Sequence, residues 1–325
     1  MTILVTGAGM IGSQIARLLL ERGETPILFD VVPQLDNIGR IVDLSRVKIV
    51  RGDVLDPLQI IRVINQEKVD KIIHTAVIFG MTGAMEKEPF PGIRLNIMGT
   101  ANVLESARLT GVKRVVFTST SAMYLRPFLG SIGQSLPEDF PIRVITGRSR
   151  SPYATSKLAC EWLGFNYLDN CGIDFVAVRF AGVFGPWRGP LSGVTGYRFR
   201  DILADGLAGK PITLSRETGW YSSDTVYSKD AARGAVLACF VEKPQQRVYN
   251  VSMGKVYTQA EIASTLRKLF PKVKVVVQAE EGEGTPGLHL PADLSKSEKE
   301  LGYKPEFLME AALKDFVGWI KDNES

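Results

Sequence analysis

The 325-residue sequence contains few residues of the types that bind metals or form disulfide bonds. It has two histidines and three cysteines, and neither a CxxC nor an HExxH spacing occurs, so we expect no metal site. An odd number of cysteines is typical of a reducing compartment. Because no long apolar run marks a signal peptide or a membrane span, we predict a cytoplasmic protein with no membrane partner.

The sequence also lacks a strong charge of one sign. Its 39 Lys and Arg against 35 Asp and Glu give a net charge of +4, spread along the chain, which is too weak to indicate a nucleic-acid partner. With 45% hydrophobic and 23% charged residues, the composition is that of an ordinary globular protein and excludes disordered, collagen-like and coiled-coil classes. The expected partner is a small-molecule substrate.

Short β-branched runs alternate with helical periods in the first half of the chain. This pattern predicts right-handed βαβ units and therefore an α/β fold with a doubly wound parallel sheet, the Rossmann fold. After residue 180 the pattern loosens into loops rich in Gly and Pro. We predict a nucleotide-binding domain over 1–180 and a smaller, mostly substrate-binding lobe over 181–325, with some segments returning to the first domain. The expected strands are 2–6, 26–30, 47–50, 71–74, 114–118 and 174–179, and the expected helices are 11–20, 56–67, one from Pro152, and 197–207, 229–242, 258–270 and 308–321.

A GxGxxG pattern lies between the first expected strand and the first expected helix, in Gly7-Ala8-Gly9-Met10-Ile11-Gly12. Gly7 allows a tight turn, Gly9 lets a pyrophosphate approach the backbone, and Gly12 lets the helix pack closely on the strand. The helix start at Met10 and Ile11 offers backbone amides and the positive end of the helix dipole. The segment therefore predicts a dinucleotide site, whereas a glycine-rich turn without a ligand is the simpler alternative.

Two acidic residues follow the next strands at positions that suit the same ligand. Asp30 comes 18 residues after Gly12, near the spacing expected for the acid that binds the adenosine ribose. It favours NAD over NADP because a carboxylate repels a 2′-phosphate, and no arginine directly follows it. Asp53 and Val54 are placed to meet the adenine edge, although Gly-Asp is also an ordinary turn sequence.

Tyr153 and Lys157 form a YxxxK pair on one face of the helix that Pro152 opens. A tyrosine has a pKa of about 10, so it needs a nearby cation to act as a base near neutrality. Thr120 follows the fifth strand, at the sheet edge where such folds bind ligands, and can hold the substrate oxygen beside the phenol. These three residues predict hydride-transfer chemistry, although YxxxK also occurs by chance in many helices.

These residues resemble the extended short-chain dehydrogenase/reductases, the NAD-dependent epimerase/dehydratase family, over nearly the whole chain. The resemblance implies Thr120, Tyr153 and Lys157 as the catalytic trio, with Lys157 also holding the nicotinamide ribose. It places Thr75, Ala76, Asn96 and Ala181 beside the cofactor, and Phe79, Ser121, Ala122, Tyr153 and Gly182 beside the substrate. The further matching motifs are the strand end at 72–76 (IHxAA), the helix at 96–105 (NxxGTxNLLE), and 151–161 (SPYxxSKxxxE), 293–296 (DxSK) and 301–305 (LGxxP).

The sequence departs from the family pattern at positions that concern the substrate. Gly182 stands where nucleotide-sugar enzymes carry an Asn, and Ser223 stands where they carry a phosphate-binding Arg. Ser121-Ala122 replaces the Asp-Glu pair of sugar 4,6-dehydratases, and the glycine turn is one residue shorter than TGxxGxxG. A diphosphate needs charge-assisted contacts. We therefore expect a compact pocket for a small hydroxylated substrate rather than a nucleotide sugar.

The leading prediction is an NAD-dependent dehydrogenase that acts on a secondary alcohol or ketone of a small polar substrate, such as a sugar or a hydroxy acid. The alternative is a nucleotide-sugar epimerase that retains its NAD, and a non-catalytic NAD sensor is the third possibility. A homodimer is expected through small and apolar residues of the helices near 95–108 and 153–168.

Overall fold

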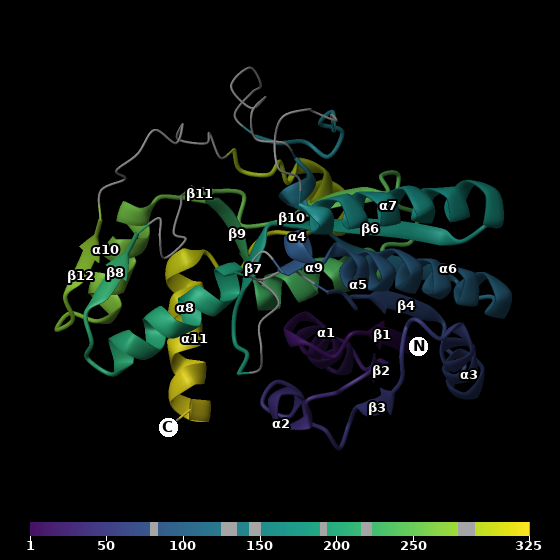
Figure 1. The fold of residues 1–325 in the computed structure, drawn as a ribbon, viewed down its shortest axis with the longest axis horizontal. Helices are drawn as coiled ribbons and strands as arrows, with labels where there is room; N and C mark the ends of the chain where they lie inside the picture. The colour runs from purple at the N-terminus through teal and green to yellow at the C-terminus, as the bar shows by residue number, and fades with distance from the viewer. Residues whose placement is uncertain are drawn as a thin grey trace.

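The centre of the protein is a seven-stranded parallel sheet with helices on both faces (Figure 1). The strand order is β10-β6-β5-β4-β1-β2-β3, which confirms the predicted doubly wound sheet. In this computed structural model, the described residues are 1–78, 84–124, 135–142, 151–188, 194–215, 223–278 and 290–324. The strands are β1 (Thr2–Thr6), β2 (Thr25–Asp30), β3 (Lys48–Arg51), β4 (Lys71–His74), β5 (Arg114–Thr120), β6 (Asp174–Phe180) and β10 (Val248–Val251).

Alternate residues of the strands point into two separate apolar cores, one on each face of the sheet. Ile3 and Val5 of β1 belong to one core, whereas Leu4 belongs to the other. Because both faces are covered by helices, the strands are almost continuously apolar, as expected for a parallel sheet. The first face is covered by α1 (Met10–Glu21) and α9 (Ser228–Phe240), and the second by α3 (Pro57–Glu67), α6 (Gly99–Thr110) and α7 (Pro152–Cys171).

A third apolar core holds the smaller lobe together, on the left in Figure 1. Phe184 and Tyr227 reach into it from two strands outside the main sheet, and their ring centres lie 5.4 Å apart. The lobe has a three-stranded sheet, β11-β9-β7, and a two-stranded sheet, β12-β8. Its elements are β7 (Gly182–Phe184), α8 (Val194–Leu207), β8 (Ile212–Leu214), β9 (Ser223–Tyr227), β11 (Val256–Tyr257), α10 (Gln259–Leu269), β12 (Val275–Val277) and α11 (Met309–Glu324).

Several short elements connect these layers. Two of them, η1 and η4, are π-helical. The short elements are α2 (Leu35–Ile38), α4 (Ala84–Lys87), α5 (Pro89–Ile93), η1 (Arg94–Met98), η2 (Ser121–Met123) and η4 (Ser297–Leu301). Within the described ranges, no helix is long and apolar enough to cross a membrane.

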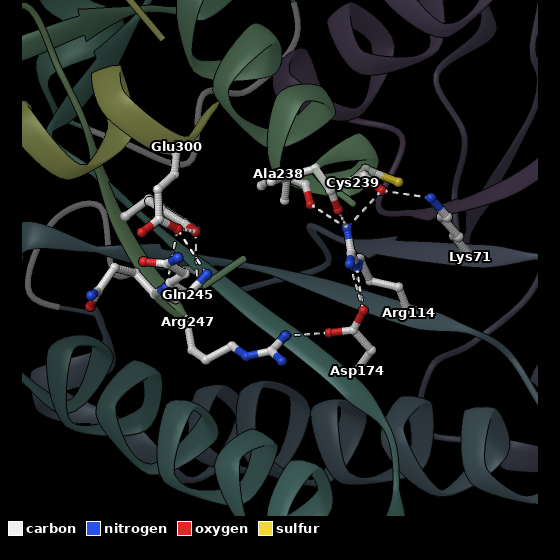
Figure 2. Close-up of polar contacts among 11 residues, drawn as sticks. Lys71, Arg114, Asp174, Ala238, Cys239, Gln245, Arg247 and Glu300 are labelled. Atoms are coloured by element: carbon white, nitrogen blue, oxygen red, sulfur yellow. Dashed lines mark hydrogen bonds and ion pairs between the residues drawn. The ribbon is translucent and has the colours of Figure 1, made fainter. Parts of the chain in front are cut away.

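A charged cluster holds the C-terminal end of α9 at the sheet edge where β4, β5 and β6 begin (Figure 2). The candidate site lies at the opposite edge of the sheet. Arg114 and Lys71 donate hydrogen bonds to carbonyl oxygens at the C-terminal end of α9, including that of Cys239. The Asp174 carboxylate forms ion pairs with both Arg114 and Arg247. Cations at this end of a helix are attracted by the negative end of its dipole, so the cluster stabilises the position of α9.

Candidate active site

The GxGxxG segment forms the turn between β1 and α1, and the observed geometry requires its glycines. Gly7 has φ +88°, in the left-handed region that favours glycine. A Cβ on Gly12 would lie 1.9 Å from the carbonyl oxygen of Gly7, so a larger residue there would push α1 away from the turn. A Cβ on Gly9 would meet nothing within 4 Å, and Gly9 is exposed. The space over Gly9 is therefore open to a ligand.

The start of α1 fits an anionic ligand. Gly9 is its N-cap, no side chain caps the helix, and the first turn, which contains Met10 and Ile11, has no acidic residue. The first backbone amides of a helix have no carbonyl partner within the helix and carry the positive end of its dipole. This end of α1 and the open space over Gly9 together suit a pyrophosphate, as the pattern predicts.

Thr75 and Ala76 lie directly against the glycine turn. The Thr75 hydroxyl is 2.8 Å from the carbonyl oxygen of Thr6 and 3.0 Å from that of Gly7, and it donates to them. The amide nitrogen of Ala76 is 2.7 Å from the place that a Cβ on Gly7 would take. The segment directly after β4 therefore contacts and supports the glycine turn.

Asp30 reaches the same turn from the end of β2. Its Oδ2 accepts a hydrogen bond from the amide of Ala8 at 2.8 Å, and its Oδ1 accepts one from the amide of Val32 at 2.8 Å. Asp53 forms an ordinary Asx turn, in which Oδ1 accepts the amide of Leu55 at 2.8 Å. Val54 is buried, and its carbonyl oxygen accepts the side-chain amide of Asn102. The adenine roles of Asp53 and Val54 stay a prediction.

Thr120 and Tyr153 meet at the carboxyl edge of the sheet. Thr120 is the last residue of β5, and its Oγ1 accepts the amide of Ala122 at 3.1 Å. Ser151 caps α7 and Pro152 opens it, which places Tyr153 in the first turn. Burial raises the pKa of Tyr153 to about 12, against the lowering effect of its hydrogen bond with Thr120. The phenol is therefore protonated near neutrality unless a further positive charge acts on it.

Lys157 lies one turn further along α7 and is buried. Its ammonium donates to the carbonyl oxygen of Thr118 at 2.6 Å and lies 4.5 Å from the centre of the Phe117 ring. Burial lowers the pKa of Lys157 to about 8. The ammonium is thus still charged near neutrality.

His74, at the end of β4, is buried beside Lys157. Its Nδ1 is 2.5 Å from the Thr6 hydroxyl, and its Nε2 is 3.1 Å from the Thr100 hydroxyl. Thr100 donates its own proton to the carbonyl oxygen of Asn96, so it accepts from Nε2–H, and Nδ1 accepts from Thr6. Burial and the charge of Lys157 lower the pKa of His74 to about 3. His74 is therefore a neutral, fully bonded residue, in line with the sheet-end role that the motif implies.

Asn96, predicted beside the cofactor, links the segment after β4 to α7. Its side chain exchanges two hydrogen bonds with the backbone of Ile78, at 2.9 and 3.1 Å, and donates to the hydroxyl of Ser156 at 2.9 Å. Ser156 in turn donates to the carbonyl oxygen of Tyr153 at 2.8 Å. Asn96 thus fixes the backbone of Ile78 and, through Ser156, the backbone of Tyr153.

The described residues among those predicted beside the substrate, and Ala181, which was predicted beside the cofactor, lie near the carboxyl ends of β5 and β6. Ser121 and Ala122 form the short η2 helix directly after Thr120. Ala181 is buried between β6 and β7, and Gly182 begins β7. Phe79 lies outside the described residues.

Sequence reasoning missed two residues of the site. The carbonyl oxygen of Thr118 accepts a hydrogen bond from the Lys157 ammonium. Every residue type has such an oxygen, so no sequence signal marks this position. Ser156 connects Asn96 to the backbone of Tyr153. Its position within the SPYxxSK motif was the available signal.

The fold and the turn define the class of Rossmann-fold dinucleotide-binding proteins, and comparison with known proteins names the family. The model of the NAD dependent epimerase/dehydratase family matches residues 3–252. The chain belongs to this family. NAD is the cofactor of the family, as the glycine turn and Asp30 predicted.

Individual relatives are similar along their whole length. The UDP-glucuronate 4-epimerase of Thermodesulfobacterium geofontis is 29% identical, over 98% of this chain and 96% of that protein. The structure of the UDP-glucuronic acid 4-epimerase from Bacillus cereus in complex with NAD is 27% identical, with TM-score 0.77 and full coverage of both chains. The UDP-glucose 4-epimerase of Thermotoga maritima has TM-score 0.82 at 24% identity, also with full coverage of both chains, and shares the fold.

Proposed function

We propose that this protein is an NAD-dependent epimerase that inverts a hydroxyl-bearing carbon of a nucleotide sugar, with C4 of a UDP-sugar as the first position to test. The observation that carries the proposal is the 29% identity to a UDP-glucuronate 4-epimerase over 98% of this chain. This choice favours the alternative of the sequence analysis over its leading dehydrogenase reading.

When bound, NAD would supply the acceptor for a hydride from the alcohol carbon. Tyr153 takes the proton of the sugar hydroxyl as the carbonyl forms, and returns it to the oxygen when the alcohol is restored. Thr120 holds the same oxygen beside the phenol. Lys157 keeps an ammonium at the site and favours the phenolate, which burial disfavours by raising the pKa of Tyr153 to about 12. Inversion requires that the hydride return to the opposite face of the sugar carbon.

We further propose that residues 1–180 bind the cofactor and that most of 181–325 forms the substrate lobe. On this proposal Gly7, Gly9, Met10, Ile11 and Gly12 hold the pyrophosphate. Asp30 holds the adenosine ribose, and Asp53 and Val54 meet the adenine. The nicotinamide half would be held by Thr75, Ala76, Asn96, Lys157 and Ala181.

A second candidate function is a dehydrogenase of a small polar substrate. It is favoured by Gly182 and Ser223, which replace the Asn and Arg expected beside a nucleotide sugar. These two departures lie close together, because β7 and β9 are neighbouring strands and Gly182 pairs with Thr225. A small hydroxylated substrate does not need the diphosphate contacts that both changes remove.

One experiment separates the two functions. The protein is incubated with NAD and either UDP-glucuronate or UDP-glucose, and the C4 epimer is followed by NMR while absorbance reports reduced nicotinamide. Formation of the epimer without net reduced cofactor supports the epimerase. Reduced cofactor formed from a small polyol or hydroxy acid, with no epimer, favours the dehydrogenase.

The matched controls lie on α7. Tyr153→Phe removes the phenol oxygen at the site. Tyr167→Phe removes the same atom further along the helix, where it donates to Glu105. Only the first change should stop turnover. Equal activity of the two variants would contradict the proposed role of Tyr153.

A further inference from the structure

Arg51 lies beside Asp30 although the two are distant in sequence. The register of β2 and β3 pairs Asp30 with Arg51, and the amide of Gly52 donates to the carbonyl oxygen of Asp30 at 2.9 Å. Arg51 is exposed, and its Nε donates to the carbonyl oxygen of Val31 at 3.2 Å. The guanidinium therefore lies along the backbone that directly follows Asp30.

Asp30 and Arg51 form hydrogen bonds with different partners. Both carboxylate oxygens of Asp30 accept backbone amides, that of Ala8 in the glycine turn and that of Val32 directly after β2. Arg51 approaches from β3, on the other side of β2. Among the ion pairs of the described residues, none joins Asp30 to Arg51. No arginine directly follows Asp30 in the chain, but the fold brings one in from the next strand.

This arrangement bears on which dinucleotide the turn accepts. A carboxylate at the end of β2 binds the ribose hydroxyls of NAD and repels the 2′-phosphate of NADP. An arginine at the same place binds a phosphate through two parallel hydrogen bonds. We propose that Arg51 can bind the 2′-phosphate of NADP, and that repulsion between this phosphate and the charge of Asp30 maintains the preference for NAD. The proposal concerns the cofactor alone and does not depend on the identity of the substrate.

Calorimetric titration with NAD and with NADP, in the absence of substrate, tests the proposal. The first variant is Asp30→Asn, which removes the charge and keeps an oxygen that can accept the amide of Ala8. Arg51→Ala is then added to it. The matched control adds Arg46→Ala instead, which removes an equal exposed charge before the other end of β3.

Asp30→Asn should bind NADP at least about 10-fold more tightly than the wild type, because repulsion is replaced by a cation within reach. Adding Arg51→Ala should abolish this gain, and adding Arg46→Ala should keep it. The gain should shrink at high salt, because an exposed cation is screened. Equal NADP affinity with and without Arg51, or equal losses from Arg51→Ala and Arg46→Ala, would overturn the proposal.

A second measurement covers the case in which Asp30→Asn disturbs the turn and binds neither cofactor. In the otherwise wild-type protein, Arg51→Ala should weaken NADP binding and leave NAD binding unchanged. Parallel losses for both cofactors would show that Arg51 supports the turn and does not recognise the phosphate.

Discussion

Replacement of His74 by Gln should make the protein less sensitive to acid. His74 is buried and neutral, with Nδ1 accepting from Thr6 and Nε2–H donating to Thr100. A Gln side chain offers one acceptor and one donor as well, but it does not take up a proton in this range. The variant therefore removes the titrating group and keeps the hydrogen-bonding types.

The size of the effect follows from the pKa of His74, which burial lowers from 6.5 to about 3. Below pH 6.5 the unfolded chain binds a proton that the folded protein does not, so stability falls as the pH falls toward 3. Between about pH 7.5 and about pH 4.5, this one group should lower the free energy of unfolding by about 3 kcal/mol. The effect is fully absent above the unfolded pKa.

Urea denaturation at several pH values measures this difference. Carboxyls such as Asp224, whose pKa desolvation raises to about 6, contribute the opposite slope, so the wild type and His74→Gln must be compared with each other. The wild type should lose about 3 kcal/mol more than the variant over the range. Thr100→Val, which keeps the imidazole, should retain the wild-type slope. The reasoning fails if wild type and His74→Gln lose equal stability.

Three further changes test the site and its surroundings. Tyr153→Phe should lower turnover by at least ~10²-fold with little change in NAD binding, measured by steady-state kinetics and calorimetry; retained activity would show that another group moves the proton. Gly9→Ala should leave the melting temperature unchanged, since its Cβ meets nothing within 4 Å, but it should weaken NAD binding by closing the open space over the turn. Gly318→Ala, with equally open surroundings, is the control. Unchanged NAD affinity of Gly9→Ala would refute the pyrophosphate role of this turn. Trp162→Asp should convert the proposed homodimer into a monomer, as measured by light scattering. Trp162 is 73% exposed on α7 beside α5, where Phe90 is 72% exposed, so the two side chains offer an apolar surface to a second copy. A monomeric wild type would contradict the dimer.

The sequence predicted well those parts of the fold that are set by local patterns. The turn between β1 and α1 was predicted because three glycines at fixed spacing meet three local steric demands, which the geometry at Gly7 and Gly12 explains. The six expected strands were found with ends shifted by at most a few residues, and β5 extends to Thr120. The strand β10 was missed, because four residues between a helix and a loop carry too little pattern.

The unpredicted features depend on contacts between distant segments. The pairing of Asp30 with Arg51 follows from the register of β2 and β3, and no spacing rule reports it. The bridge from Asn96 through Ser156 to Tyr153 joins two helices in the same way. The expected substrate class rested on Gly182 and Ser223, whereas the relatives compared above are epimerases of UDP-glucuronate.

The fate of the hydrogen on C4 tests the central claim most directly. The protein is incubated with NAD and UDP-glucuronate carrying deuterium at C4, and both sugar epimers are analysed by NMR and mass spectrometry. A hydride that leaves C4 and returns within the same site should leave the deuterium at C4 of both epimers. Loss of the deuterium to water during inversion would contradict a hydride-transfer site built from Thr120, Tyr153 and Lys157.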